Sequence, residues 1–196
     1  MKAAILFPTR QEAQYYTGLR ETSPEVHICG IGAVSCAAIT ARIITSQHPE
    51  IIILAGIAGA YRGSGLQIGN TVIVEKENIA DMGAMRKEGF IPLPIDGKDT
   101  ANNCYICDTS IPDIFLKIIS NTVNVAGTPY LDPEVASAQI ENMEGAAFFA
   151  VCRALGTPFI EIRTISNFVG DGKDKWDIPL AANNLAVSLR ELCETL

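Results

Sequence analysis

The sequence predicts an α/β protein in which a largely parallel or mixed sheet has helices on both faces. Short runs rich in β-branched residues alternate with segments of helical periodicity, and the alternation returns in the last third of the chain. The length of 196 residues and the hydrophobic content of 48% suffice for one sizeable core. We therefore expect a single domain over residues 1–196, with ligands bound at the carboxyl ends of its strands.

The first half of the chain contains four predicted strands and two predicted helices. Apolar and β-branched runs predict strands at 3–7, 25–29, 50–57 and 70–76. The segments "RQEAQYYTGLR" at 10–20 and "AVSCAAITARIITSQ" at 33–47 have helical patterns, and Pro49 closes the second.

The middle of the chain is the least regular part. From 79 to 110 it is rich in Gly, Pro, Asp and Asn and has little periodicity, which indicates a long excursion of the kind that often serves as a lid. We expect a helix near 113–120 and a strand near 122–126 after it.

The last third begins with the stretch "ENMEGAAFFAVCRALGTPFIEIRTISNFVG". Its apolar residues recur at helical spacing from Glu144 to Leu155, Gly156 provides the stop, and Pro158 prevents continuation. A strand at 158–166 follows, and a final helix is expected at 178–194.

Three polar residues lie within this otherwise apolar stretch. Glu144 falls in the first helical turn, where the helix dipole favours a negative charge. Arg163, Ile165 and Asn167 share one side of the strand if it stays extended. Taken singly, Glu144 is best interpreted as a helix cap and Arg163 as neutralising Glu161 or another neighbour. Together, near the end of a strand, they indicate a ligand site.

Charge and hydropathy restrict the partners of this protein. A net charge of −7 and a pI near 4.8 argue against a nucleic acid or an anionic membrane as partner and favour a small molecule. The longest apolar run, at 51–61, is too short to span a bilayer, which needs about 20 residues. With no secretory signal in view, we expect a cytoplasmic protein.

The six cysteines are expected to be reduced thiols. Cys104 and Cys107 form one C-x-x-C, but no second pair follows, and His27 and His48 lie far upstream, so a zinc site is hard to assemble. We expect no metal and treat these thiols as incidental.

Two glycine-containing segments are expected to be tight turns that approach a ligand. In "CGIGAVS", Ser35 stands where a dinucleotide fingerprint has its third glycine, and a plain turn is equally compatible with this pattern. "LAGIAGAYRGSGLQIG" lacks the Lys-Ser/Thr of a P-loop.

These motifs, in this order along the chain, carry a family resemblance. The segments "FPTRQEA", "GIGAVSCAA", "LAGIAGAYRGSGLQIGNTVIV" and "ADMGA", followed by the 141–170 stretch, resemble the nucleoside phosphorylase and nucleosidase superfamily. Within it, "NMEGAAFF" paired with "IRTISNFVG" and Trp176 is most similar to the futalosine hydrolases. The resemblance covers nearly the whole chain and is weak between 83 and 140. It implies a three-layer α/β/α fold and hydrolysis of a purine N-glycosidic bond without a cofactor.

The resemblance also implies roles for individual residues. Glu12 matches the glutamate that activates water, and Arg163 an arginine near that water. Met143 and Glu144 match a pair that packs on the ribose and hydrogen-bonds to it. Asn167 stands where the adenine-releasing nucleosidases have a proton-donating aspartate.

Two departures from the family pattern bear on the substrate. An asparagine at 167 cannot deliver a proton as a carboxylic acid can, which points away from adenine and toward hypoxanthine, a better leaving group. Ile57, in the pocket turn formed by Ile57, Ala58 and Gly59, replaces the hydroxyl residue that holds phosphate in the phosphorylases. Water is then the expected nucleophile.

Two further assignments depend on the resemblance alone. Tyr130 could stack on the base or be a core residue, and the segment from Phe90 to Pro94 could be a lid, an ordinary loop or a contribution to the site of a neighbouring subunit. Family members are commonly dimers, so a homodimer or higher homo-oligomer is expected.

Three rival functions remain open. A methylthioadenosine/S-adenosylhomocysteine nucleosidase is disfavoured by Asn167, and a nucleoside phosphorylase by Ile57. A catalytically silent nucleoside-binding protein would have no need for a water-activating carboxylate at Glu12.

Overall fold

The computed structural model describes residues 2–17, 24–92, 104–110, 113–127 and 137–196. Five α-helical and 3-10 segments are placed in these ranges: α1 (Arg10–Thr17), α2 (Ala33–Gln47), α4 (Gly145–Leu155), η2 (Lys173–Lys175) and α5 (Ile178–Thr195). The strands described are β1 (Ala3–Phe7), β2 (Glu25–Ile28), β3 (Ile51–Ala60), β4 (Thr71–Ile79), β5 (Gly83–Arg86), β6 (Gly89–Pro92), β7 (Cys104–Ile106), β8 (Leu116–Thr122), β9 (Ile140–Asn142) and β10 (Phe159–Phe168).

Most of these strands form one mixed sheet, as the sequence predicted. Its pairings run in the order β10-β4-β8-β9-β3-β1-β2, and β7 pairs with β4. The β1–β2, β1–β3, β3–β10, β4–β8 and β8–β9 pairs are parallel, whereas β4–β10, β3–β9 and β4–β7 are antiparallel. Because β10 also pairs with β3, the strands β3, β10, β4, β8 and β9 form a closed ring of pairings.

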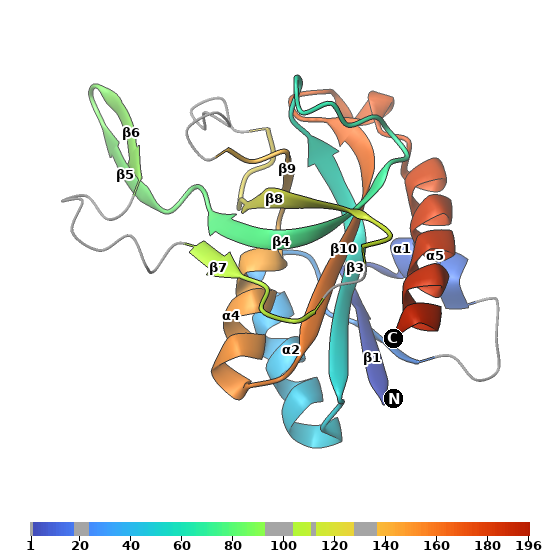
Figure 1. Cartoon of the computed structure of the whole chain (residues 1–196). Coiled ribbons are helices and arrows are strands. Elements are labelled where there is room, and N and C mark those ends of the chain that lie inside the picture. The colour runs from blue at the N-terminus through green and yellow to red at the C-terminus, as the bar shows by residue number, and fades with distance from the viewer. Residues whose placement is uncertain (1, 18–23, 93–103, 111–112, 128–136) are drawn as a thin grey trace.

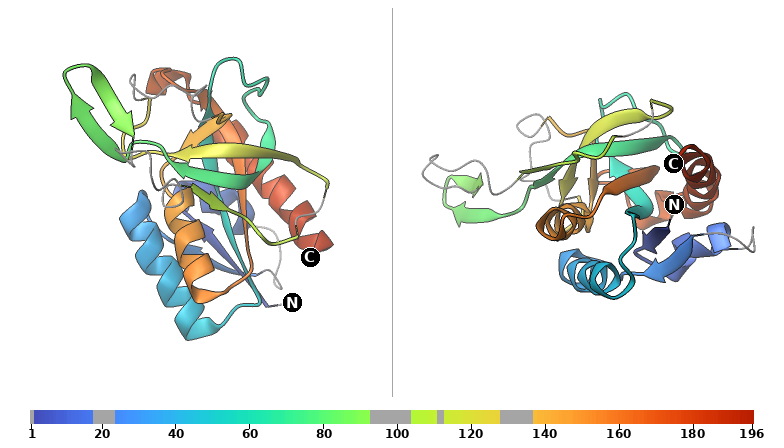
Figure 2. Two further views of the ribbon diagram at one scale, coloured as in Figure 1. Left: turned by 60° about the vertical axis from the view of Figure 1, so that its left-hand side comes forward. Right: turned by 60° about the horizontal axis from the view of Figure 1, so that its bottom comes forward.

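Two layers of helices cover this sheet, which confirms the three-layer α/β/α arrangement (Figure 1). Alternate residues of β1 and β3 face opposite sides, as the pleat of a strand requires. Leu6 and Leu54 belong to the core beneath α2 and α4, whereas Ile5 and Ile53 belong to the core beneath α1 and α5. Figure 2 shows the two helix pairs on opposite sides of the strands.

The predicted helices agree closely with the structure. α2 and α5 have nearly the predicted bounds, and α4 ends at Gly156, which adopts a left-handed conformation with φ of 65°. Residues 18–20 of the first predicted helix lie outside the described ranges. None of the helices in the described ranges is long and apolar enough to cross a membrane.

The helix predicted near 113–120 and the strand predicted near 122–126 were wrong. The segment is instead the strand β8, which ends at Thr122 and pairs in parallel with both β4 and β9. The spacing of its apolar residues is compatible with a helix or with a strand. Pairing with the neighbouring strands favours the strand.

The excursion predicted from 79 to 110 contains more regular structure than expected. β5 and β6 pair as an antiparallel hairpin, which extends away from the rest of the molecule in Figure 1. β7 adds a short strand against β4. The hairpin includes Phe90, but residues 93 and 94 of the predicted lid segment lie outside the described residues.

The pocket turn predicted at 57–59 is a strand. β3 continues to Ala60, because β10 and β9 pair with its last residues. In β10, a bulge between Ile165 and Asn167 interrupts the predicted alternation of side chains. Ser166 as well as Asn167 therefore faces the cavity described next, whereas Ile165 belongs to the core.

Candidate active site

A cavity of about 430 Å³ opens at the carboxyl ends of β1, β3 and β10. Parallel strands place their carboxyl ends at the same edge of a sheet, so segments distant in sequence meet there. The predicted residues Glu12, Met143, Glu144, Arg163 and Asn167 all line it, together with residues 57–59. The volume lies in the range of about 300–1,000 Å³ that is typical of small-molecule sites.

Glu12 is held in place by the start of α1 and the backbone of β3. Thr9, before the helix, accepts a hydrogen bond from the Glu12 amide at 3.2 Å, and its hydroxyl donates to Glu12 Oε2 at 2.5 Å. The Ile57 amide donates to Glu12 Oε1 at 3.0 Å. Burial raises the pKa of Glu12 above its ordinary value of 4.5, while Thr9, Ile57 and the charge of Arg163 act in the opposite direction.

Glu144 does not cap α4 with its side chain, although it is the N-cap residue. Its Oε1 accepts a hydrogen bond from the Gly32 amide at 3.0 Å, in the turn between β2 and α2. Its Oε2 accepts one from Arg163 Nη2 at 3.2 Å. The glycine turn and the arginine thus fix this carboxylate at the cavity wall.

Arg163 is completely buried and joins the polar groups of the site. Its Nε donates to Glu161 at 2.7 Å, its Nη1 to the Ile57 carbonyl at 3.3 Å, and its Nη2 to both Asn142 and Glu144. Burial opposes its charge, but Glu161 and Glu144 outweigh that effect and raise the pKa of Arg163. Pairing with Glu161 was therefore predicted correctly, and Arg163 holds Glu144 as well.

Gly56 makes the approach of Glu12 and Arg163 possible. A Cβ on Gly56 would lie 2.5 Å from Arg163 Nη1 and 3.2 Å from Glu12 Oε1. No motif in the sequence singles out Gly56. The segment "AGIAG" contains small residues throughout, and only the register of β3 against β10 identifies which of them faces the arginine.

Behind the cavity lies a second polar group that sequence reasoning missed. Glu77 on β4 accepts hydrogen bonds from Thr122 at 2.7 Å and from Asn142 at 2.5 Å, and it is fully buried near Glu161. Burial and the neighbouring Glu161 raise the pKa of Glu77 well above its ordinary value. Burial also raises the pKa of Glu161, whereas the charge of Arg163 and its hydrogen bond lower it.

Asn167 lines the cavity near the end of β10. Its Nδ2 donates to the Phe168 carbonyl at 3.0 Å, and its Oδ1 accepts a hydrogen bond from the Ser166 hydroxyl at 2.7 Å. The amide nitrogen keeps one further hydrogen for a ligand. The predicted stacking residue Tyr130 lies outside the described residues.

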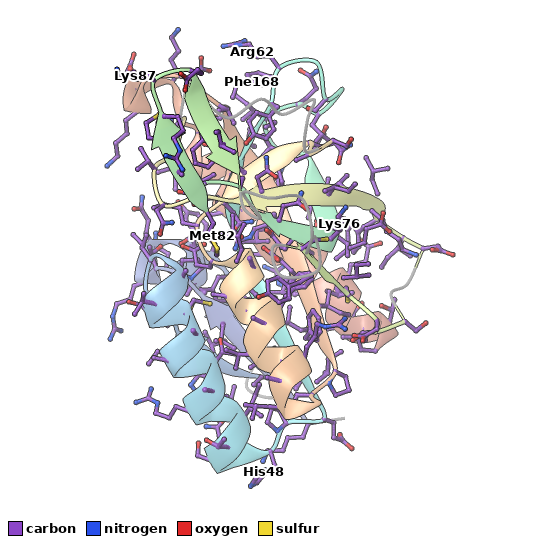
Figure 3. The ribbon with its side chains drawn as sticks, turned by 90° about the vertical axis from the view of Figure 1, so that its left-hand side faces the viewer. His48, Arg62, Lys76, Met82, Lys87 and Phe168 are labelled. Atoms are coloured by element: carbon purple, nitrogen blue, oxygen red, sulfur yellow. The ribbon has the colours of Figure 1, made fainter. Side chains whose placement is uncertain are left out.

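A cation and an aromatic ring lie together next to Asn167, at the end of β10. Arg62 lies 5.0 Å from the centre of the Phe168 ring, and its Nη2 pairs with Asp171 at 2.6 Å. Figure 3 shows Arg62 and Phe168 together at the end of the molecule opposite His48. Trp176 also lines the cavity and donates from Nε1 to the Asp171 carbonyl at 3.3 Å.

The thiols take no part in this site. All six cysteines are free, and Cys107 donates to the Phe159 carbonyl at 3.3 Å. Burial raises the pKa of Cys107, which favours the thiol over the thiolate.

Comparisons with known proteins identify the family of this chain. The family model for the phosphorylase superfamily matches residues 131–195. The chain is 34% identical to a futalosine hydrolase of Thermus thermophilus, over 96% of this chain and 93% of that protein. It is 27% identical to a 5′-methylthioadenosine/S-adenosylhomocysteine nucleosidase of Haemophilus influenzae, over 85% of this chain and 79% of that protein.

Solved structures share the fold. The 5′-methylthioadenosine nucleosidase of Arabidopsis thaliana superimposes with a TM-score of 0.82 at 18% identity, covering 98% of this chain and 94% of that one. The Neisseria meningitidis nucleosidase in complex with methylthio-immucillin-A does so with a TM-score of 0.79 at 19% identity, covering all of both chains. The chain belongs to the nucleoside phosphorylase and nucleosidase superfamily, among its N-glycosyl hydrolases.

Proposed function

We propose that the protein hydrolyses the N-glycosidic bond of futalosine, releasing hypoxanthine and dehypoxanthinyl futalosine, a step of menaquinone biosynthesis by the futalosine route. The observation that carries this proposal is that the neutral Asn167 and the carboxylate of Glu12 line one and the same cavity. The similarity to the futalosine hydrolase of Thermus thermophilus supports it.

Glu12 is proposed to align and deprotonate the attacking water. Its carboxylate already has one fixed partner on each oxygen, Thr9 and Ile57, so it keeps one orientation and still has free lone pairs. A raised pKa makes it a stronger base at neutral pH. General-base assistance of this kind contributes about 10²–10⁴-fold in rate.

Glu144 and Met143 are proposed to hold the ribose. A carboxylate that accepts a sugar hydroxyl positions the ring, and its negative charge stabilises the oxocarbenium-like sugar that forms as the bond breaks. Arg163 acts as a positioning residue, since its fixed hydrogen bonds hold Glu144 and its charge favours the ionised Glu12.

Asn167 is proposed to relieve the charge on the departing base by donating a hydrogen bond to N7. It cannot transfer a proton, so the reaction favours a base that leaves readily without one. Hypoxanthine, with a carbonyl at position 6, meets this requirement better than adenine.

Water is the proposed nucleophile because the wall beside Glu12 offers phosphate little to bind. Ile57 and Ala58 present apolar side chains there, and the Ile57 amide is already occupied by Glu12. A phosphate group needs several donors to replace its hydration.

The alternative substrate is a 5′-methylthioadenosine-type nucleoside, which the 27% identity to the Haemophilus influenzae enzyme supports. A silent nucleoside-binding protein is the alternative without catalysis. To separate these functions, the protein is incubated with futalosine, methylthioadenosine and inosine, with and without phosphate, and the released base is measured. Hypoxanthine release from futalosine that does not depend on phosphate is expected, whereas dominant adenine release from methylthioadenosine would refute the proposal.

A further inference from the structure

The proposed mechanism gives no role to the carboxyl group of Glu141. Glu141 on β9 is only 6% exposed and yet lines the cavity. Its Oε1 accepts a hydrogen bond from the Gly127 amide at 2.7 Å, and its Oε2 accepts one from the Tyr61 hydroxyl at 3.2 Å. These bonds fix the carboxyl group and, among the residues that the structure describes, leave a lone pair on each oxygen for a ligand.

The register of three strands places Glu141 beside Asn167. Asn167 on β10 pairs with Gly59 on β3, and Gly59 pairs with Glu141 on β9. A Cβ on Gly59 would lie 3.2 Å from Asn167 Nδ2 and 3.7 Å from Glu141 Cγ. Because a glycine separates them, a carboxamide and a carboxyl group flank the same open space at the end of the cavity where the base is proposed to bind.

We propose that Glu141 determines which purine is accepted, by accepting a hydrogen bond from the N1–H of a 6-oxopurine while Asn167 donates to the same base. This inference rests on the proposed function and adds to it a residue that selects the base. Adenine has no hydrogen on N1 and presents a lone pair there. The Glu141 carboxylate would then face the lone pair on N1 of adenine. Neither group can donate a hydrogen, so both would be buried without a hydrogen bond, which disfavours adenine.

The surroundings of Glu141 make this selection depend on pH. Burial raises the pKa of Glu141, hydrogen bonds from Gly127 and Tyr61 lower it, and the charge of Asp81 raises it. Tyr61 and Asp81 are its titratable neighbours in the described structure, and Asn121 and Asn167 on the flanking strands are neutral. Once protonated, Glu141 can donate to N1 of adenine, so discrimination against adenine weakens as the pH falls.

The test compares futalosine with its 6-amino counterpart, which differs only in the base. For the wild type, kcat/KM should favour the 6-oxo substrate, and this preference should decline toward acidic pH. Glu141→Gln should reduce the preference by about 10- to 100-fold, the value of a hydrogen bond to a charged group, because an amide can both accept and donate. It should also remove the pH dependence of the ratio, which a merely structural role for Glu141 would leave in place.

Glu75→Gln is the matched control, since it removes an exposed carboxylate from β4 outside the cavity and should preserve the ratio. An unchanged ratio with an unchanged pH dependence in Glu141→Gln overturns the proposal. Should this variant fail to fold, binding of free hypoxanthine and free adenine to the wild type decides the matter, and equal affinity at neutral pH contradicts it. If the wild type releases no base from any nucleoside, the proposed function fails while the binding of the free bases still tests Glu141.

Discussion

Glu12 and Arg163 meet across Gly56, where the absence of a side chain lets a carboxylate and a guanidinium approach one point on the backbone of β3. At this level β3 pairs with β10, with Gly56 opposite Arg163, and the pairing of β1 with β3 ends two residues earlier, at Leu54. The arrangement links the first helix of the chain to its last strand through a single glycine.

Gly56→Ala tests that arrangement. The added methyl group would overlap Arg163 Nη1, so the guanidinium must shift and Glu144 must follow it. A displacement of about 1 Å in a catalytic group can reduce the rate about 100-fold, and we expect a loss of that order in kcat. Steady-state kinetics alongside thermal unfolding check this, and a fully active variant would show that the close approach is not needed.

Glu12→Gln should abolish turnover while leaving nucleoside binding largely intact. The amide preserves the size and one acceptor of the carboxylate but cannot take a proton from water. Binding of a non-hydrolysable substrate analogue, measured by calorimetry, separates the two effects. Unchanged kinetics would remove Glu12 from the mechanism.

The acid limb of the rate profile should report the pKa of Glu12. The base must be ionised to act, so activity should fall as the pH falls through this pKa, which burial raises above 4.5. Thr9→Val removes the hydroxyl that favours the ionised form, so the midpoint of the limb should move to higher pH. Thr9→Ser retains the hydroxyl and should leave it in place, and a limb that does not move in Thr9→Val would contradict this assignment.

The buried carboxyl groups of Glu77 and Glu161 should make stability fall as the pH rises. Both have a pKa raised above the ordinary 4.5, so the folded state binds protons more tightly than the unfolded chain, and this contribution is complete below about pH 4.5 and is lost as the pH rises through the folded values. Glu77→Gln, which cannot ionise, should give a shallower decline. Urea unfolding at a series of pH values measures it, and an unaltered slope would contradict the interpretation.

Gly145→Ala should be destabilising, although alanine normally stabilises a helix by about 1 kcal/mol relative to glycine. The added Cβ would contact Glu77 Oε1 and lie 2.6 Å from Glu161 Oε2, so it would enter the space between these two buried carboxyl groups. We expect a loss of about 1–3 kcal/mol in the free energy of unfolding, as for other overpacked sites. A stabilised variant in chemical denaturation would show that the space can relax.

The sequence predicted the parts of the fold that depend on local pattern. The strand of β1, the helices α2, α4 and α5, and the stop at Gly156 follow from periodicity and capping. The strand β8, the three-residue strand β9 and the closed ring of pairings depend on contacts between distant segments, which no local pattern contains.

The residues of the site also divide into those that a local pattern predicts and those that only the fold identifies. Glu12, Glu144 and Arg163 were predicted and do line one cavity. Thr9 had a visible signal, because Thr9 and Glu12 have the spacing of a capping box. Gly56 and Glu141 had none, because their importance follows from strand register and from the side chains that face them.

The most direct test of the account is the fate of the water oxygen. Futalosine is incubated with the protein in water enriched in ¹⁸O, with phosphate present, and the sugar product is analysed by mass spectrometry. Attack by water held at Glu12 predicts one ¹⁸O atom in dehypoxanthinyl futalosine, formed together with free hypoxanthine and absent with Glu12→Gln. A phosphorylated sugar product, or labelled product formed at the same rate by Glu12→Gln, would contradict the account.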